Sequence, residues 1–288
     1  MRVLIVGCGY VGIELGALLF AKGHEVHGLR RHPPVEDFVR AGISPAAADL
    51  LDANAMARLP WPFDWVVNCA AAPNGESRTY RRTYVDGNRA LLDCLERHPA
   101  KRLVYTSSTS VYGQDDGGWV DESAPTTPGT PNGDCLVEAE QMIIAARGSQ
   151  GLPATILRVA GIYGPERGYW LRQFLNGEAR MEGDGGRYLN MIHVEDVAGA
   201  IEAVLKHADT GPIYNAGDNA PATQREMFEW LSDRLQRPFP AIVPAGSRRR
   251  GVTNKRIDNR KLRQETGWLP KYPTFREGYE ALLGTITL

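Results

Sequence analysis

Three glycines near the N-terminus have the spacing of a loop that binds phosphate. Gly7, Gly9 and Gly12 form the pattern GxGxxG directly after the apolar run at 3–6. The first glycine permits a tight turn, the second lets a pyrophosphate approach the backbone, and the third packs the following helix against the strand. Free N–H groups at the start of that helix hold the anion. We therefore expect Gly7, Gly9, Tyr10, Val11 and Gly12 to bind a dinucleotide, with a purely structural glycine turn as the alternative.

The second apolar run ends in two arginines. In sites specific for NAD, an acidic residue at the end of the second strand binds the ribose hydroxyls. Here the run at 25–29 leads into Arg30 and Arg31 instead. Guanidinium groups suit the 2′-phosphate of NADP, so the sequence favours NADP over NAD, with two solvated arginines as the alternative. Asp49 and Leu50 follow the next short strand and are expected to contact the adenine.

Alternating strands and helices must position these residues. Short apolar, β-branched runs alternate with stretches of helical period, which is typical of a parallel sheet covered by helices on both faces. We predict strands at 3–6, 25–29, 65–68, 102–106 and 154–159, and helices at 11–22, 79–97, 135–147, 195–206 and 223–236. The sequence thus predicts an α/β fold with a Rossmann-type doubly wound parallel sheet in residues 1–160. Residues 161–288 are expected to form a smaller substrate-side lobe, interleaved with the first.

Composition limits the partners of the chain. Its 288 residues carry a formal net charge of -1, so no global field favours nucleic acid or an anionic membrane. No apolar run approaches the ~20 residues needed to span a bilayer. The four cysteines lack CxxC spacing, which indicates reduced core thiols and no metal site. We expect a cytoplasmic protein that binds a small-molecule substrate, and neither nucleic acid nor membrane.

Six further segments accompany the glycine loop in a characteristic order. They are NCAAAP (68–73), YTSSTSVYG (105–113), LRVAGIYGP (157–165), NMIHVEDVAGAI (190–201), YNAGD (214–218) and IDNRKLRQETGW (257–268). In these segments the chain resembles the extended short-chain dehydrogenases/reductases of the NAD-dependent epimerase/dehydratase type, and among them the atypical YeeZ-like bacterial branch. An unrelated Rossmann protein such as a methyltransferase would leave these matches as coincidences. The family habit implies a monomer or homodimer.

The resemblance also implies roles for individual residues. Ser108 matches the serine or threonine that hydrogen-bonds the reacting oxygen of the substrate, and a serine that only caps a turn is the alternative. Residues at the ends of the fourth, fifth and sixth strands would face the cofactor. These expected cofactor contacts are Ala70, Ala71, Ala72, Thr106, Ser107, Arg158, Val159 and Ala160.

The catalytic tyrosine and lysine of the family are absent. In the family, the tyrosine of YxxxK exchanges a proton with the substrate, and the lysine lowers the tyrosine pKa from its free value near ~10. The spacing from Ser108 and Glu140 places Asn132 at the tyrosine position and Leu136 at the lysine position. No tyrosine in the chain has a lysine four residues later. A proton would therefore need another donor.

Three side chains are candidates for that donor. Tyr84 occupies the position of the family's active-site asparagine, Tyr112 follows the Ser108 loop, and Asp134 lies near the altered motif. We prefer Tyr112. The alternative for each tyrosine is that its ring packs and its hydroxyl bonds outward. His193 stands at a predicted strand-to-helix junction and is expected to be structural.

Two functional hypotheses remain. The first is an NADP-dependent oxidoreductase or epimerase-like enzyme that acts on a small carbonyl, alcohol or nucleotide-sugar substrate. The second is a non-catalytic NADP(H)-binding redox sensor or regulatory module, which the missing Tyr/Lys pair favours. Retention of Ser108 favours the enzyme. Arg248, Arg249 and Arg250, with Lys255 and Arg256 close behind, would suit a substrate phosphate, and a solvated basic loop is the alternative.

Overall fold

The large sheet has seven parallel strands. The structure is a computed structural model that describes residues 1–207, 213–244 and 253–285. The strand order is β12-β7-β5-β4-β1-β2-β3. From β1 the chain adds β2 and β3 on one side, and it then crosses to add β4 and the later strands on the other side, so the order switches between β1 and β4. The strands are β1 (Arg2–Val6), β2 (Glu25–Arg30), β3 (Ile43–Ala47), β4 (Trp65–Asn68), β5 (Arg102–Ser108), β7 (Ala154–Val159) and β12 (Ile213–Ala216). The predicted doubly wound α/β fold is confirmed, and the five predicted strands all belong to this sheet.

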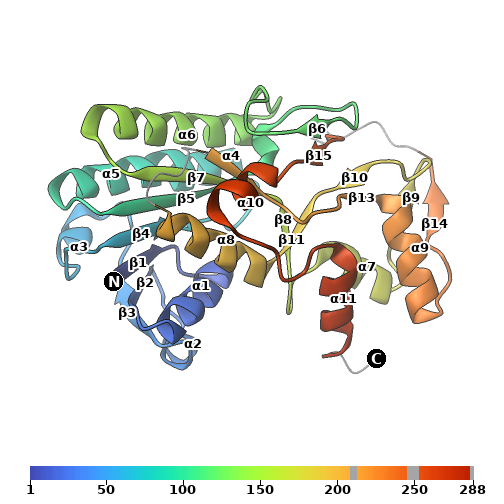
Figure 1. The fold of residues 1–288 in the computed structure, drawn as a ribbon, viewed down its shortest axis with the longest axis horizontal. Coiled ribbons are helices and arrows are strands. Elements are labelled where there is room, and N and C mark those ends of the chain that lie inside the picture. Colours follow the sequence, from blue (N-terminus) through green and yellow to red (C-terminus); the bar gives the residue numbers. More distant parts are fainter. Residues whose placement is uncertain (208–212, 245–252, 286–288) are drawn as a thin grey trace.

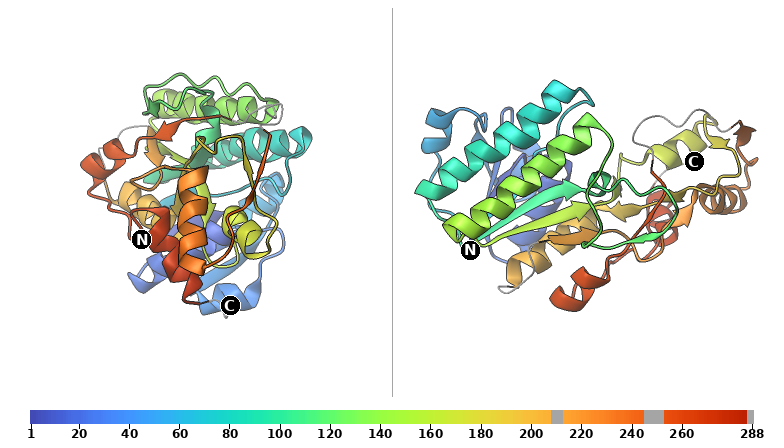
Figure 2. Two further views of the ribbon diagram at one scale, coloured as in Figure 1. Left: turned by 90° about the vertical axis from the view of Figure 1, so that its right-hand side faces the viewer. Right: turned by 90° about the horizontal axis from the view of Figure 1, so that it is seen from above.

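Helices cover both faces of the sheet, as Figures 1 and 2 show. All residues of β4 and β7 are buried, because parallel strands between two helical layers bury both faces. One apolar cluster joins the sheet to α1 (Tyr10–Ala21), α2 (Val35–Arg40) and α8 (Val194–Lys206). A second cluster joins the other face to α3 (Ala53–Ala57), α5 (Gly87–Arg97) and α6 (Pro131–Gln150). Helices α5 and α6 lie side by side on that face (Figure 2, right).

Local sequence signals explain where several helices begin and end. Thr130 caps α6 by accepting a hydrogen bond from the Gly133 N–H, Pro131 occupies the first turn, and Gly151 ends the helix with a φ of 65°. Capping boxes start α9 (Gln224–Leu235) and α11 (Phe275–Leu283), each with a threonine cap and a glutamate three residues later. These ends are therefore encoded locally.

The smaller lobe lies beside the carboxyl ends of the strands, at the right of Figure 1. Its core is rich in aromatic and methionine side chains from α7 (Tyr169–Leu175), α9 and α11. Short strand pairs frame it: β8 (Gly161–Tyr163) with β11 (Met191–His193), β9 (Arg180–Glu182) with β14 (Ala241–Val243), and β10 (Tyr188–Leu189) with β13 (Ala222–Thr223). After residue 160 the chain also returns to the large sheet, because β12 pairs with β7 and α8 packs against α1.

The predicted helix at 79–97 is three elements. It consists of α4 (Ser77–Tyr80), the π-helix η1 (Arg81–Asp86) and α5. The side chain of Asn88 donates a hydrogen bond to the Tyr84 carbonyl oxygen at 2.7 Å, inside the π-helical segment. The hydrophobic period of the sequence does not mark the π-helix, which contributes a single buried residue, Val85. Along the described part of the chain, no helix combines the length and apolar character that crossing a membrane requires.

Candidate active site

A cleft of about 970 Å³ opens at the carboxyl ends of the central strands, between the large sheet and the smaller lobe. Parallel α/β sheets bind ligands at this edge, where the strand order reverses. Most predicted site residues line it. They are Gly7, Gly9, Tyr10, Val11, Arg30, Arg31, Asp49, Leu50, Ala70, Ala71, Ala72, Tyr84, Thr106, Ser107, Ser108, Val159 and Ala160.

The glycine loop is built for close approach of the backbone. Gly7 has a φ of +69°, and a Cβ placed on it would overlap the backbone of Ala70. Gly7 can therefore not be replaced without displacing the neighbouring wall of the cleft. Gly12, which the sequence placed in the same loop, does not line the cleft. A Cβ on Gly12 would lie 3.0 Å from the Ile5 side chain, so this glycine packs α1 against β1.

Buried asparagines hold the neighbouring wall, which follows β4. Asn68, at the end of β4, accepts a hydrogen bond from the Ala70 N–H at 3.1 Å and donates to the Asn88 side chain at 2.8 Å. Asn88 in turn donates to the Tyr84 carbonyl oxygen. The loop that follows β4 and the π-helix are thus fixed by one buried network.

Basic side chains occupy the far end of the cleft. Arg30 and Arg31 are exposed on its wall at the end of β2. Asp49 also lines it and pairs with Arg82, whose Nη2 lies 3.1 Å from the Asp49 Oδ2. Sequence analysis missed Arg82, because neither a motif nor a strand end marks its position.

Ser108 caps a turn and also lines the cleft. Its hydroxyl oxygen accepts a hydrogen bond from the Ser110 N–H at 3.2 Å and caps the short helix η2 (Thr109–Val111). The same residue lines the cleft, and its own O–H is not used in that bond. Ser108 can therefore donate a hydrogen bond into the cleft while it holds the turn.

Tyr84 also lines the cleft, from the π-helix. Burial raises the pKa of Tyr84 above its ordinary value of 10, and a backbone hydrogen bond with Ala72 opposes this in part. Tyr84 is therefore a protonated phenol at neutral pH. Tyr80, which sequence analysis missed, lies one helical turn earlier on the same wall, with its ring centroid 5.0 Å from that of Tyr84. The i, i+4 spacing of the two tyrosines was the available signal.

The structure does not bring Tyr112, the proton donor preferred from the sequence, to the cleft. Tyr112 is fully buried and does not line the cleft. Its hydroxyl donates to the Asn215 Oδ1 at 2.8 Å and accepts from the Arg158 Nη1 at 2.7 Å. Arg158 likewise does not reach the cofactor side, because it is buried in an ion pair with Glu140. Asp134 is exposed in the first turn of α6, away from the cleft wall.

The two residues that the sequence placed at the Tyr/Lys positions lie differently in the structure. Asn132 lies outside the cleft wall, and its side chain donates to the Gly75 carbonyl oxygen at 2.8 Å. Leu136 is buried and lines the cleft. An apolar side chain therefore lines the cleft at the position that the sequence assigned to the family's lysine.

The other basic and histidine candidates lie elsewhere. Arg248, Arg249 and Arg250 fall outside the described residues. Lys255 is buried, lies outside the cleft wall, and donates to the Tyr112 carbonyl oxygen at 3.1 Å. His193 accepts a hydrogen bond from the Glu195 N–H and so caps α8.

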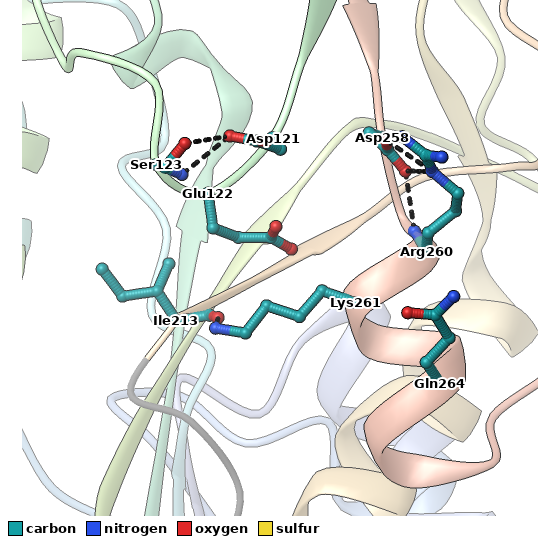
Figure 3. Close-up of a pocket in the computed structure, with 8 residues that line it drawn as sticks. All are labelled: Asp121, Glu122, Ser123, Ile213, Asp258, Arg260, Lys261 and Gln264. Atoms are coloured by element: carbon teal, nitrogen blue, oxygen red, sulfur yellow. Dashed lines mark hydrogen bonds and ion pairs between the residues drawn. The ribbon is translucent and has the colours of Figure 1, made fainter.

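A second hollow, of about 540 Å³, lies beside the outer edge of β12 (Figure 3). Its charged groups are largely used within its own lining. Arg260 pairs with Asp258, and Lys261 donates to the Ile213 carbonyl oxygen at 2.9 Å. Glu122 accepts a hydrogen bond from the Asn215 N–H at 2.7 Å. These contacts cap an otherwise open strand edge and do not indicate a ligand.

Comparison with known proteins agrees with this geometry. Residues 3–217 match the family model of the NAD dependent epimerase/dehydratase family. Protein YeeZ from Escherichia coli (strain K12) is 30% identical over 94% of this chain and 96% of its own length. UDP-glucose 4-epimerase from Corynebacterium glutamicum is 27% identical over 96% of this chain and 93% of its own. A solved structure from Methylobacillus flagellatus, assigned to the NAD-dependent epimerases/dehydratases, shares 32% identity with a TM-score of 0.78, covering 99% of this chain and 98% of that one.

The chain therefore belongs to the NAD dependent epimerase/dehydratase family. The resemblance to the YeeZ-like branch is confirmed as well.

Proposed function

We propose that the protein is an NADP-dependent oxidoreductase or epimerase-like enzyme that acts on a small carbonyl, alcohol or nucleotide-sugar substrate. The observation that carries this proposal is the single cleft that joins the glycine loop, two arginines at the end of β2, Ser108 and Tyr84. A module that only binds a dinucleotide does not need Ser108 and Tyr84 beside the glycine loop. The name of the C. glutamicum relative, UDP-glucose 4-epimerase, supports a nucleotide sugar as one substrate class.

The residues of the cleft fit a dinucleotide. Gly7 lines the cleft with its backbone packed against that of Ala70, and the first N–H groups of α1, which no side chain caps, follow it. Arg30 and Arg31 would hold the 2′-phosphate, with Asp49 and Leu50 near the adenine. When bound, the cofactor supplies hydride chemistry, and the protein supplies orientation and the proton.

Tyr84 is the proposed proton donor in place of the family tyrosine. Because burial raises its pKa and Leu136 brings no cation to the wall, Tyr84 holds its proton at neutral pH. Such a phenol suits protonation of a carbonyl oxygen, with Ser108 donating a hydrogen bond to the same oxygen. We therefore infer that Tyr84 enters the reaction as the protonated phenol.

Cofactor choice is tested by calorimetric titration with NADPH and NADH. We expect the double variant Arg30→Ala/Arg31→Ala to weaken NADPH binding at least about 10-fold, because charge-assisted bonds to phosphate are worth roughly 1.5–3 kcal/mol. NADH binding should change little. Arg40→Ala is the matched control, since Arg40 is exposed on α2 outside the cleft wall. An unchanged ratio of the two affinities would contradict the assignment of NADP.

The second candidate, a redox sensor without turnover, is separated from the enzyme by a reaction screen. The wild-type protein with NADPH is mixed with carbonyl compounds and nucleotide sugars while cofactor oxidation is followed by absorbance. For any substrate found, we expect Ser108→Ala and Tyr84→Phe each to lower kcat by roughly 10²-fold or more, with the Kd for NADPH nearly unchanged. Tight NADPH binding with no oxidation across the panel would favour the sensor.

A further inference from the structure

A short segment of the smaller lobe crosses to the glycine loop. The Tyr10 hydroxyl, in the first turn of α1, donates a hydrogen bond to the Pro165 carbonyl oxygen at 2.9 Å. Gly164 and Arg167 are paired through their backbones at 2.8 and 3.0 Å, which makes a tight turn of this segment. Gly164 has a φ of +155°, and a Cβ there would meet the Tyr10 hydroxyl. The turn is therefore shaped to rest on Tyr10.

Arg167 extends from this turn into the cofactor cleft. It lines the cleft, and its guanidinium carbon lies 5.3 Å from the centroid of the Tyr10 ring. Within the part of the chain that the structure describes, no carboxylate forms an ion pair with Arg167. A planar cation held against an aromatic ring, and not neutralised by a carboxylate, keeps its hydrogen-bond donors for an anion.

The place of this cation determines which anion it meets. Tyr10 is the first residue of α1, so Arg167 lies beside the helix N-terminus that the glycine loop opens. Arg30 and Arg31 stand instead at the end of β2 on the same cleft wall. The cleft therefore presents arginines at two separate places, the end of β2 and the N-terminus of α1.

We propose that Arg167 binds the diphosphate of the dinucleotide from the smaller lobe, opposite the glycine loop, and that the bond from Tyr10 to Pro165 holds it there. This inference rests on the proposed function, because it takes the cleft to be the NADP site. The guanidinium can form two parallel hydrogen bonds to phosphate oxygens, which the backbone N–H groups of α1 contact from the other side. Arg167 thereby couples cofactor binding to the position of the smaller lobe.

The test compares two variants that each replace one exposed arginine of the smaller lobe and so remove the same charge. Arg167→Gln removes the proposed contact, and Arg172→Gln on α7 is the control, because Arg172 does not line the cleft. Each protein is titrated with NADPH and with 2′-AMP, which carries the 2′-phosphate but no diphosphate. We expect Arg167→Gln to raise the Kd for NADPH at least about 10-fold and to leave 2′-AMP binding within twofold. Arg172→Gln should leave both values unchanged.

Two more variants test the geometry. Arg167→Lys keeps the charge but loses the planar pair of donors, so its Kd for NADPH should lie between those of the wild type and Arg167→Gln. Tyr10→Phe keeps the ring but removes the bond to Pro165, and we expect a two- to fivefold weaker Kd for NADPH.

Four results would overturn the proposal. The first is an NADPH Kd of Arg167→Gln within twofold of the wild type. The second is an equal loss of 2′-AMP affinity in that variant, and the third is an equal loss of NADPH affinity in Arg172→Gln. The fourth is a loss of turnover in Arg167→Gln without any loss of NADPH affinity, which would place Arg167 on the substrate. Failure of the wild type to bind either NADPH or NADH would overturn the proposed function itself and the Arg167 contact with it.

Discussion

The buried ion pair between α6 and β7 allows a quantitative prediction. Glu140 and Arg158 are 2% and 4% exposed, and the Arg158 Nη2 lies 2.6 Å from the Glu140 Oε2. The Arg158 Nε contacts both carboxylate oxygens at 3.1 Å, and the Ser107 hydroxyl donates to Glu140 at 2.6 Å. Glu140→Gln would leave the guanidinium without a countercharge in a dry interior. Breaking such a pair costs roughly 3–5 kcal/mol, so we expect the free energy of unfolding to fall by about that amount.

The same helix supplies the control. Glu138 forms a bidentate pair with Arg81 at 2.9 and 3.0 Å, but the two side chains are 38% and 54% exposed. Glu138→Gln should therefore cost only about 0–1 kcal/mol. In urea unfolding with an m value of about 3 kcal/mol/M, Glu140→Gln should lower the midpoint by roughly 1 M or more, and Glu138→Gln by about 0.3 M or less.

The double variant Glu140→Gln/Arg158→Met separates lost charge pairing from lost packing. It removes the uncompensated guanidinium, so we expect it to be at least as stable as Glu140→Gln alone. If Glu140→Gln and Glu138→Gln differ by less than about 1 kcal/mol, the reasoning from burial is refuted.

Two further predictions concern the loop and the smaller lobe. We expect Gly7→Ala to weaken NADPH binding at least about 10-fold in calorimetry, because the new Cβ would overlap the Ala70 backbone, and an unchanged Kd would contradict that close approach. Burial raises the pKa of Asp218 to about 8 from an ordinary value of 3.8, so the unfolded state releases the proton first and wild-type stability falls as pH rises between these values. Asp218→Asn removes this titration. In urea unfolding between pH 5 and 8, the free energy of unfolding of the variant relative to that of the wild type should therefore rise by about 1.4 kcal/mol per pH unit. If the two proteins show parallel plots of stability against pH, the buried carboxyl is not the cause.

Much of the cofactor cleft could be predicted from sequence, because its parts lie at strand ends. GxGxxG directly after an apolar run fixes a turn, and Arg30 follows the last residues of a predicted strand. In a parallel sheet, neighbouring strand ends meet at one edge, so Thr106 and Ala70 come to the same cleft without any knowledge of the loops between them.

Side-chain direction and long-range pairing could not be predicted in this way. Tyr112 has the right distance from Ser108 along the chain, but after η2 its ring turns inward to Asn215, 103 residues later. Arg158 is drawn away from the cleft by Glu140, and Arg167 is brought to Tyr10 from 157 positions along the chain. These contacts depend on how the lobes pack, which local periodicity does not encode.

The return of the chain to the large sheet has a consequence for how this protein can be divided. A fragment ending at residue 160 would keep the glycine loop, but it would lack β12 and α8. All six residues of β7 are buried in the intact protein, so the fragment would expose an apolar strand with unpaired backbone groups, which is a template for aggregation. We therefore expect that the first 160 residues do not fold as an autonomous unit, and that a functional half-protein would require the segments after residue 190 to be grafted back onto it.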